Sequence, residues 1–423
     1  MAMTKNILIS GASVAGPALA YWLHRHGHSV TIVEKATGLR DGGYAVDFRG
    51  EAHLRILREM GVLDDIRREQ THTGAMVYVN ANGKKLASMP ADLFAGDVEI
   101  LRGDLARILF EKTAPYTRYV FGDSIARMDE ERVAGESTGV TVTFDSGAVG
   151  RYDLVIGADG LHSGVRRLAF GPEEDHVSHL GLYCAIFTVP NHLGIDHAGL
   201  AYTTPGKVVT MYSARENTEA KAVFYFGAPL TDIDRRDVAA QQRLLAETFA
   251  GNGWESDRLL GMMADAPDFY FDSVSQVRMD GWTRGRVALL GDAAYCPSSL
   301  SGMGTGLAMV AAYVLAGELA EAGGDHVVAF ARYEEAMREY VAGCQKQGQG
   351  VARLMVPENR VIAWLLRQNY KLMPYLPGKK MIANSVRKTA ENIALKDYLV
   401  RRSSQTGTIV SASSPAVIAN PPA

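Results

Sequence analysis

Three short glycine-containing motifs lie far apart in the chain, and each follows an apolar run typical of a buried strand. They are Gly11-Ala12-Ser13-Val14-Ala15-Gly16, Gly157-Ala158-Asp159-Gly160 and Gly291-Asp292-Ala293-Ala294. Backbone amides at strand-to-helix turns bind anionic groups, and an acidic side chain there accepts hydrogen bonds from sugar hydroxyls. Because the carboxyl ends of parallel strands meet at one edge of a sheet, the three motifs together predict one nucleotide site.

The first motif is typical of a dinucleotide fingerprint in which serine replaces the middle glycine. It lies between an expected strand at residues 6–10 and an expected helix at residues 14–26. Gly11 and Gly16 allow a tight turn and close packing of the helix on the strand. The residues expected to present their backbone to a diphosphate are Ser13, Val14 and Ala15. Alone, the motif is also compatible with an ordinary strand–helix turn.

Acidic residues follow three of the expected strands. Glu34 ends the second strand, where its carboxylate can accept from ribose hydroxyls, and Lys35 directly after it belongs to the same predicted contact region. Asp292 follows a third apolar run and can accept from a ribityl chain, although a turn or helix-cap aspartate is the simpler alternative. Asp159 and Arg166 either hold phosphates or form a structural bridge at the domain junction.

A glycine-rich turn and an arginine complete the set. Gly302-Met303-Gly304 opens an apolar helix over residues 307–316, whose amides and dipole can stabilise negative charge at the N1–C2=O edge of a reduced flavin. The glycines also suit close packing of a buried helix, and both explanations can hold. Arg102 is either a cofactor anchor or a surface charge at a helix start. Taken as a set, these motifs predict a site for FAD.

Composition excludes several other classes of protein. The 423 residues, of which 47% are hydrophobic and 22% charged, predict a globular protein of two or three domains. A net charge of −3 gives no reason to expect a nucleic acid or a membrane as partner. Three scattered cysteines predict reduced thiols and a cytoplasmic location, and metal-ligand spacings are absent from the sequence. The cluster His24, His26 and His28 predicts a solvated turn at a helix end.

Two apolar stretches need separate explanations. Residues 7–23 after Lys5 resemble a signal peptide, but the glycine pattern favours a strand, a turn and a helix. Residues 307–319 contain Glu318 and are too short to cross a bilayer, which predicts a buried helix.

The order of patterns predicts an α/β fold: a Rossmann-like FAD-binding domain with an inserted antiparallel-sheet substrate domain and C-terminal helices. Short strands rich in Tyr, Phe, Val and Thr dominate residues 178–226, and Phe187, Met211 and Phe224 are candidates to line a substrate pocket. The expected parts are residues 1–175 and 279–350 for the FAD domain, 176–278 for the substrate domain, 351–400 for helices over the substrate cavity, and 401–423 for a disordered tail.

Taken together, the motifs resemble those of the class A, single-component flavin-dependent monooxygenases of the para-hydroxybenzoate hydroxylase fold group. The resemblance covers roughly residues 5–320, in order and spacing. Within the group, several stretches are similar to the tetracycline-inactivating monooxygenases and nearby polyketide hydroxylases. These stretches are residues 14–18, 42–50, 98–105 and 291–306, together with the helical region 350–400.

The resemblance implies roles for individual residues. It implies that FAD is contacted or positioned by Gly11, Gly16, Glu34, Arg102, Asp159 and Asp292. It also implies that Pro297, Gly302 and Gly304 lie beside the isoalloxazine ring, with Arg49 and Asp47 in a segment that borders the flavin.

The implied reaction uses NADPH, or NADH, as a transient reductant, and O2 then forms a flavin C4a-hydroperoxide. One oxygen atom is transferred to an aromatic or polycyclic polyketide, tetracyclines included. The role of the protein is to exclude water and to place the substrate. We expect the protein to be a monomer or a weak homodimer.

Three positions depart from the family pattern. Many members carry His where Tyr295 stands, Gln at Met303 and Asn at Gly306, which puts the contacts at the flavin edge in question. One alternative is therefore a non-catalytic FAD- or ligand-binding protein. A second alternative is a reductase or a halogenase of the same fold, and the Trp-x-Trp-x-Ile-Pro run expected of halogenases is absent from the sequence.

Overall fold

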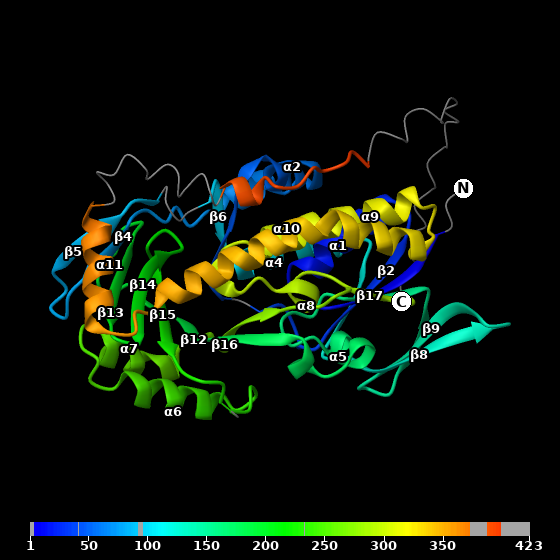
Figure 1. Cartoon of the computed structure of the whole chain (residues 1–423). Helices are drawn as coiled ribbons and strands as arrows, with labels where there is room; N and C mark the ends of the chain where they lie inside the picture. The colour runs from blue at the N-terminus through cyan, green and yellow to red at the C-terminus, as the bar shows by residue number, and fades with distance from the viewer. Residues whose placement is uncertain (1–3, 41, 92–95, 232, 373–386, 399–423) are drawn as a thin grey trace, which may run out of the picture.

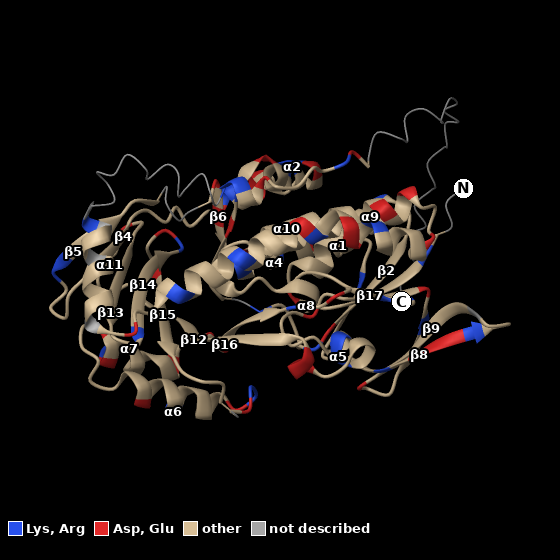
Figure 2. Ribbon diagram, viewed as in Figure 1, with Lys and Arg blue, Asp and Glu red and all other residues tan. Residues whose placement is uncertain are grey.

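The computed structural model describes residues 4–40, 42–91, 96–231, 233–372 and 387–398. Figure 1 shows two parts, each built around a sheet, with the long helix α10 (His326–Met355) running from one to the other. Charged residues lie mostly on helices, on turns and on the hairpin of β8 (Ile125–Val133) and β9 (Glu136–Phe144), whereas the central strands are largely uncharged (Figure 2). The predicted α/β fold is confirmed. The predicted tail at residues 401–423 lies outside the described residues.

The first sheet has six strands in the order β17-β18-β11-β1-β2-β7. Their bounds are Asn6–Ser10 for β1, Ser29–Glu34 for β2, Arg118–Phe121 for β7, Leu154–Gly157 for β11, Thr283–Arg284 for β17 and Val287–Leu289 for β18. All neighbouring pairs are parallel except β17 with β18. Since β1, β11 and β18 are almost entirely buried, their apolar runs suit a sheet covered on both faces. The parallel pairing places the carboxyl ends of β1, β2, β11 and β18 at one edge.

Helices α1 (Ala15–Arg25) and α9 (Gly304–Glu321) pack together, with the Trp22 and Tyr313 rings edge to face at 4.9 Å. Helix α9 is buried along almost its whole length, which confirms the expectation for residues 307–319. Within the described residues, no helix is both long enough and apolar enough to cross a membrane.

Smaller elements surround this sheet. They are β3 (Ala45–Phe48) paired with β6 (Val98–Leu101); α2 (Gly50–Met60), α3 (Leu63–Arg68) and α4 (Arg102–Thr113); the three-stranded sheet of β8 (Ile125–Val133), β9 (Glu136–Phe144) and β10 (Val149–Tyr152); and α5 (Gly164–Phe170) with the 3-10 turn Glu173–Asp175. The short α8 (Asp292–Tyr295) follows β18.

The second sheet has seven strands in the order β16-β12-β15-β14-β13-β4-β5. Their bounds are Met76–Val79 for β4, Lys85–Met89 for β5, Val177–Pro190 for β12, Gly199–Thr204 for β13, Lys207–Ala214 for β14, Glu219–Gly227 for β15 and Phe269–Val277 for β16. Only the β13–β4 pair is parallel. The sequence analysis assigns residues 1–175, and with them the β4–β5 hairpin, to the FAD domain. In the structure this hairpin instead joins the edge of the second sheet. The other domain boundaries stay predictions.

The two faces of the second sheet pack against different helices. Helices α6 (Val238–Phe249) and α7 (Ser256–Met262) cover one face, and they pack against the side chains of Phe187, Met211 and Phe224. The interpretation of these three residues as pocket-lining is therefore wrong. Strand residues of the opposite parity, Cys184, Ile186, Val208 and Val223 among them, face the end of α10 and the loop containing Leu300. Helix α11 (Arg360–Leu372) lies on that second side.

Replacing Phe224 tests this assignment of faces. Phe224 stacks on Phe187 with ring centroids 5.7 Å apart and meets Phe249 of α6 edge to face at 4.9 Å. We expect Phe224→Leu to lower the free energy of unfolding by about 1–3 kcal/mol, measured by urea titration, because a well-packed ring is lost. The visible spectrum of bound flavin should stay unchanged. A changed flavin spectrum would contradict the assignment of Phe224 to the face covered by α6 and α7.

The histidine cluster at the end of α1 is only partly solvated. His24 is exposed as expected, but His28 is buried and its Nδ1 accepts from the Lys5 N–H at 3.2 Å. Burial, together with the nearby Lys5 charge, lowers the pKa of His28 from 6.5 to about 4.

This shift predicts a pH-dependent contribution to stability. Between pH 6.5 and 4 the unfolded chain binds a proton at His28 that the folded protein does not bind. The free energy of unfolding should therefore fall as the pH falls through this window, by about 1.4 kcal/mol per pH unit from this group. Urea titrations measure the free energy of unfolding of the unmodified protein and of His28→Gln. The difference between the two proteins should change as the pH falls from 6.5 to 4. A difference that is independent of pH would contradict the prediction.

Candidate functional site

The turn after β1 closes so tightly that two of its positions require glycine. Gly11 has φ +108°, and a Cβ there would lie 2.3 Å from the Ala158 carbonyl oxygen. A Cβ at Gly16 would lie 2.0 Å from the Gly11 carbonyl oxygen. The turn leads into α1, and its N-cap residue Val14 makes no side-chain hydrogen bond to the first helical turn. This arrangement leaves the helix N-terminus open to an anion, which fits the diphosphate of a dinucleotide.

Glu34 at the end of β2 fixes the same turn. Its two carboxylate oxygens accept from the N–H groups of Ala12 and Ala36, both at 2.9 Å. Each oxygen keeps a further lone pair, so acceptance from a ribose hydroxyl stays a prediction compatible with this geometry. Lys35 follows with an exposed side chain, and its contact with the cofactor also stays a prediction.

The second and third motifs are joined through a buried arginine. Arg166 donates to the carbonyl oxygens of Ala293 at 2.9 Å and Leu161 at 2.7 Å. The Asp159 carboxylate accepts from the Val165 N–H at 3.1 Å and from the Ser163 hydroxyl. Asp159 therefore stabilises the start of α5, while Arg166 bonds to backbone carbonyls instead of forming the Asp–Arg bridge of the structural alternative. A direct contact of Asp159 with the cofactor stays a prediction.

Asp292, Pro297 and Gly304 lie together at the start of α9. A Cβ built on Gly304 would lie 3.4 Å from the Asp292 Oδ1 and 3.8 Å from the Pro297 Cγ. Burial raises the pKa of the Asp292 carboxyl above its ordinary value, and the positive charge of Arg102 opposes that rise. Arg102 packs on the backbone of Gly43. A buried carboxylate beside an open helix N-terminus matches the donors of a ribityl chain and the anionic edge of a reduced flavin.

Arg49 reaches the same region from β3 and α2. Its guanidinium forms an ion pair with Asp47 at 2.5 Å, and its Nη2 lies 3.7 Å from the Cβ position of Gly302. Gly302 has φ +62°, so the turn before α9 also needs glycine. Among the predicted site residues, Arg49, Arg102, Asp292, Pro297, Gly302 and Gly304 therefore gather around the start of α9, where the flavin is predicted to lie.

The positions that depart from the family pattern lie at the end of α8, just before α9 and in its first turn, and all three are buried. The Tyr295 hydroxyl lies 2.8 Å from that of Tyr333, and its ring meets Trp282 edge to face. Met303 is fully buried in the core of the first domain. At Gly306 the space that a side chain would occupy is filled by the ring of His53.

A face of the second sheet that is rich in tyrosine lies beside the loop containing Leu300, and the sequence analysis did not predict it. Tyr44 meets Tyr270 edge to face with centroids 6.2 Å apart, and the Ala45 N–H donates to the Tyr212 hydroxyl at 3.1 Å. Burial raises the pKa of Tyr44, Tyr212, Tyr225 and Tyr270, which keeps these side chains neutral phenols. The even-numbered residues of β14 and β16 and the odd-numbered residues of β15 share this face. The alternation of side chains along these strands would identify this face from the sequence if the position of one residue on either side of the sheet were known.

A cavity of about 100 Å³ continues this face toward α11. Its lining is mostly apolar, with three hydroxyl groups. The lining residues are Met76, Tyr78, Ala201, Thr203, Val208, Thr210, Leu354, Met355, Pro357, Ala363 and Leu366.

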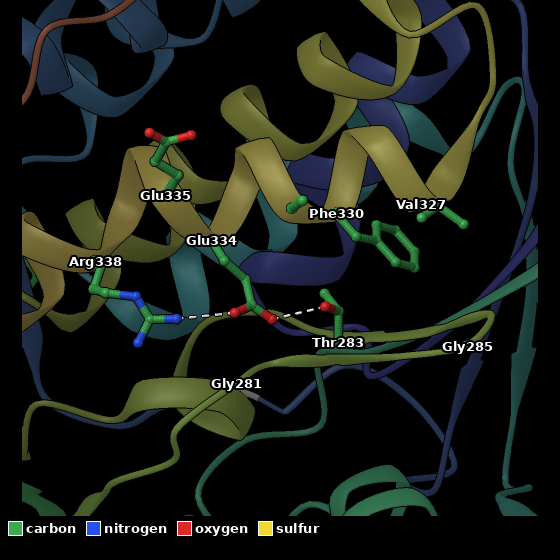
Figure 3. Close-up of a pocket in the computed structure, with 9 residues that line it drawn as sticks. Gly281, Thr283, Gly285, Val327, Phe330, Glu334, Glu335 and Arg338 are labelled. Carbon is green, nitrogen blue, oxygen red and sulfur yellow. Dashed lines mark hydrogen bonds and ion pairs between the residues drawn. The ribbon is translucent and has the colours of Figure 1, made fainter.

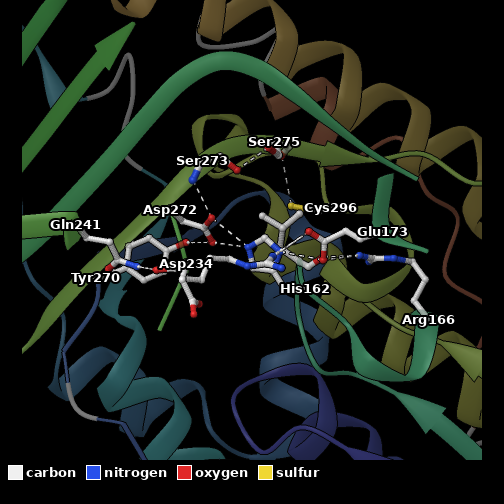
Figure 4. Close-up of polar contacts among 12 residues, drawn as sticks. His162, Arg166, Glu173, Asp234, Gln241, Tyr270, Asp272, Ser273, Ser275 and Cys296 are labelled. Carbon is white, nitrogen blue, oxygen red and sulfur yellow. Dashed lines mark hydrogen bonds and ion pairs between the residues drawn. The ribbon is translucent and has the colours of Figure 1, made fainter. Parts of the chain in front are cut away.

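A polar network connects the second motif to the second sheet (Figure 4). His162 lies between the carboxylates of Glu173, at 3.0 Å, and Asp272 of β16, at 2.9 Å. Burial raises the pKa of Asp272 to about 6. Because Arg166 of α5 lies 3.7 Å from Glu173, the network links the second sheet to the loops that surround the predicted cofactor site.

A surface groove beside β17 and α10 is occupied by structural contacts (Figure 3). Glu334 accepts from the Trp282 N–H and from the Thr283 hydroxyl, both at 2.7 Å. Arg338 donates to the same carboxylate at 3.0 Å. Because these groups satisfy one another at the antiparallel edge of the first sheet, we assign this groove no part in the site.

Adding one methyl group at Gly16 tests whether the first turn holds the cofactor. We expect Gly16→Ala to purify with less than about a tenth of the FAD bound by the unmodified protein, since the turn must open to relieve the overlap. FAD content is measured from the visible absorbance of the purified protein. Gly261→Ala is a matched control, because a Cβ there has no neighbour within 4 Å. Full FAD content in Gly16→Ala would contradict the assignment.

Comparison with known proteins identifies the family of the chain. The family described as "FAD binding domain" matches residues 4–345. A flavin-dependent monooxygenase of Legionella longbeachae is 42% identical over 365 residues, covering 85% of this chain and 92% of that protein. An uncharacterised protein of Mycobacterium tuberculosis is 47% identical over 343 residues, with 80% and 91% covered.

Two solved structures of tetracycline destructases are similar to this chain in both fold and sequence. The crystal structure of tetracycline destructase Tet(55) has a TM-score of 0.79 and 39% identity, with 93% of this chain and 99% of that chain covered. For tetracycline destructase Tet(51) the TM-score is 0.81 and the identity 36%, with 94% and 100% covered. These findings confirm the resemblance stated from the sequence. The chain belongs to the FAD-binding-domain family and is an FAD-dependent monooxygenase.

Proposed function

We propose that the protein uses NADPH or NADH and O2 to insert one oxygen atom into an aromatic or polycyclic polyketide, with tetracyclines as the first candidates. One observation carries the proposal: the turns after β1, β2, β11 and β18 converge with the start of α9 opposite a buried, tyrosine-rich sheet face. FAD bound there supplies the redox chemistry and the activation of oxygen. The chain itself must bind the cofactor, exclude water and orient the substrate.

Residues at the turns and at the start of α9 would bind different parts of the cofactor. The amides after Gly11 and the Glu34 carboxylate would hold the diphosphate and ribose. Asp292 and Arg102 would hold the ribityl chain. The N-terminal turn of α9, beginning at Gly304, would carry its positive end toward the flavin ring. Each role follows from position at the shared edge of the sheet and from the open helix ends described above.

The opposite face suits a substrate with fused rings and enol or phenol oxygens. Neutral tyrosine hydroxyls donate hydrogen bonds to such oxygens, and the tyrosine rings present edges and faces to a flat aromatic skeleton. The apolar cavity beside Val208 gives room for the end of a substrate longer than a single ring. The two tetracycline destructases among the similar structures support testing tetracyclines first.

Mass spectrometry of a tetracycline panel tests the proposed function. Purified FAD-loaded protein is incubated with each drug, NADPH and ¹⁸O2. We expect a product that carries one labelled oxygen atom and is absent when NADPH is omitted. If NADPH is consumed to give hydrogen peroxide while every drug stays intact, the tetracycline assignment fails. If NADPH and NADH are not consumed with any aromatic substrate, the alternative of a non-oxygenating FAD protein gains support.

A pair of adjacent substitutions tests which sheet face binds the substrate. Val208 lines the cavity, whereas Val209, also buried, packs on the α6–α7 side. We expect Val208→Phe to raise KM at least about fivefold by filling the cavity, with FAD content unchanged. Val209→Phe should lower the urea midpoint without raising KM. Equal effects of the two variants on KM would contradict the assignment.

A further inference from the structure

His53 joins three elements that surround the flavin side of the site. It lies in α2 and is 1% exposed. Its Nδ1 lies 3.0 Å from the Arg49 backbone nitrogen, and its Nε2 lies 2.7 Å from the hydroxyl of Tyr340 in α10. Its ring also packs on Gly306, in the first turn of α9. The histidine therefore contacts the residue before α2, the middle of α10 and the start of α9.

The hydrogen bonds around His53 allow only one arrangement of protons. The Arg49 N–H can only donate, so the His53 Nδ1 accepts and the ring proton lies on Nε2. Nε2–H then donates to the Tyr340 oxygen. Burial, with the Arg49 charge acting in the same direction, lowers the pKa of His53 to about 4, so the ring is neutral at physiological pH. The ring orientation is fixed from both sides.

The missing side chain at position 306 makes room for this ring. A Cβ on Gly306 would lie 2.1 Å from the His53 Cε1 and 2.6 Å from each ring nitrogen. Two residues earlier, Gly304 lies against Asp292 and Pro297. The imidazole thus packs directly on the helical turn whose N-terminus faces the predicted flavin position.

We propose that His53 is a positioning residue for the flavin: it holds the Arg49 backbone and the first turn of α9 in register with each other. Through the backbone of Arg49 it sets where the guanidinium lies beside Gly302. Through Gly306 it sets the position of the α9 N-terminus. His53 itself makes no contact with the flavin in this account. The inference rests on the proposed function, which places the flavin beside Asp292, Gly302 and Gly304.

His28 provides a matched control within the same domain. It is also buried, it also accepts a backbone N–H through Nδ1, and burial also lowers its pKa to about 4. It differs in position, because it precedes β2 and contacts Lys5 before β1, at the edge opposite the motif turns. A histidine that only supports the core should behave like His28 when it is replaced.

The test compares His53→Ala, His53→Gln and His28→Ala by three measurements. These are the FAD dissociation constant of the apoprotein from flavin fluorescence quenching, the flavin reduction potential, and the urea midpoint. We expect His53→Ala to weaken FAD binding about tenfold and to shift the potential, because the Arg49 N–H loses its acceptor and the α9 turn loses its support. His53→Gln should recover most of the affinity, since an amide both accepts and donates. His28→Ala should lower the midpoint while the dissociation constant changes less than about twofold.

A second pair of variants tests the contact with α9 alone. Gly306→Ala should weaken FAD binding because its methyl group overlaps the imidazole, whereas His53→Ala/Gly306→Ala should bind no worse than His53→Ala. The inference is overturned if His53→Ala lowers the urea midpoint but leaves the FAD affinity and the reduction potential unchanged. It is also overturned if His53→Ala and His28→Ala change the affinity and the potential equally. If the unmodified protein binds no FAD, the proposed function fails first.

Discussion

The close approach of two backbone segments at the end of β1 is the constraint on which the rest of the site depends. Gly11 lies against the Ala158 carbonyl after β11, and Gly16 lies against the carbonyl of Gly11. Any side chain at either position would separate α1 from β1 or β1 from β11. Because β1 is central in the sheet, this contact sets the distances between the turns that follow β2, β11 and β18.

Helix α10 then connects the loop beside the predicted cofactor site to the second sheet. The Pro297 carbonyl oxygen accepts from the buried Gln276 amide of β16 at 3.0 Å, and it lies 2.1 Å from the Cβ position of Gly348 in α10. Gln345 of α10 donates to the Val277 carbonyl at 2.7 Å. The loop beside the predicted flavin is thus held by the strand that carries Tyr270 and Asp272. A shift of either sheet would therefore move this loop, and under the proposed function such a movement would couple substrate placement to the cofactor.

The sequence predicts the parts of this arrangement that depend on local chemistry. The turns at Gly11, Asp159 and Asp292 follow their strands as expected, because glycine and acidic residues directly after an apolar run favour a turn at the end of a strand. The sequence does not predict which face of the second sheet meets the substrate. Phe187 and Phe224 are large and aromatic whichever way they point, and only the packing of α6 decides their side. Nor does it predict His53, since its partners at positions 49, 306 and 340 come together only in the folded chain.

The central claim is that the three motif turns and the start of α9 form one cofactor cradle. Hydrogen exchange of the apoprotein, followed by mass spectrometry with and without added FAD, tests this claim most directly. The account predicts increased protection at residues 11–16, 34–36 and 292–306 together, with the strands behind α6 and α7 unaffected. Protection confined to one of these segments, or located elsewhere in the chain, would contradict it.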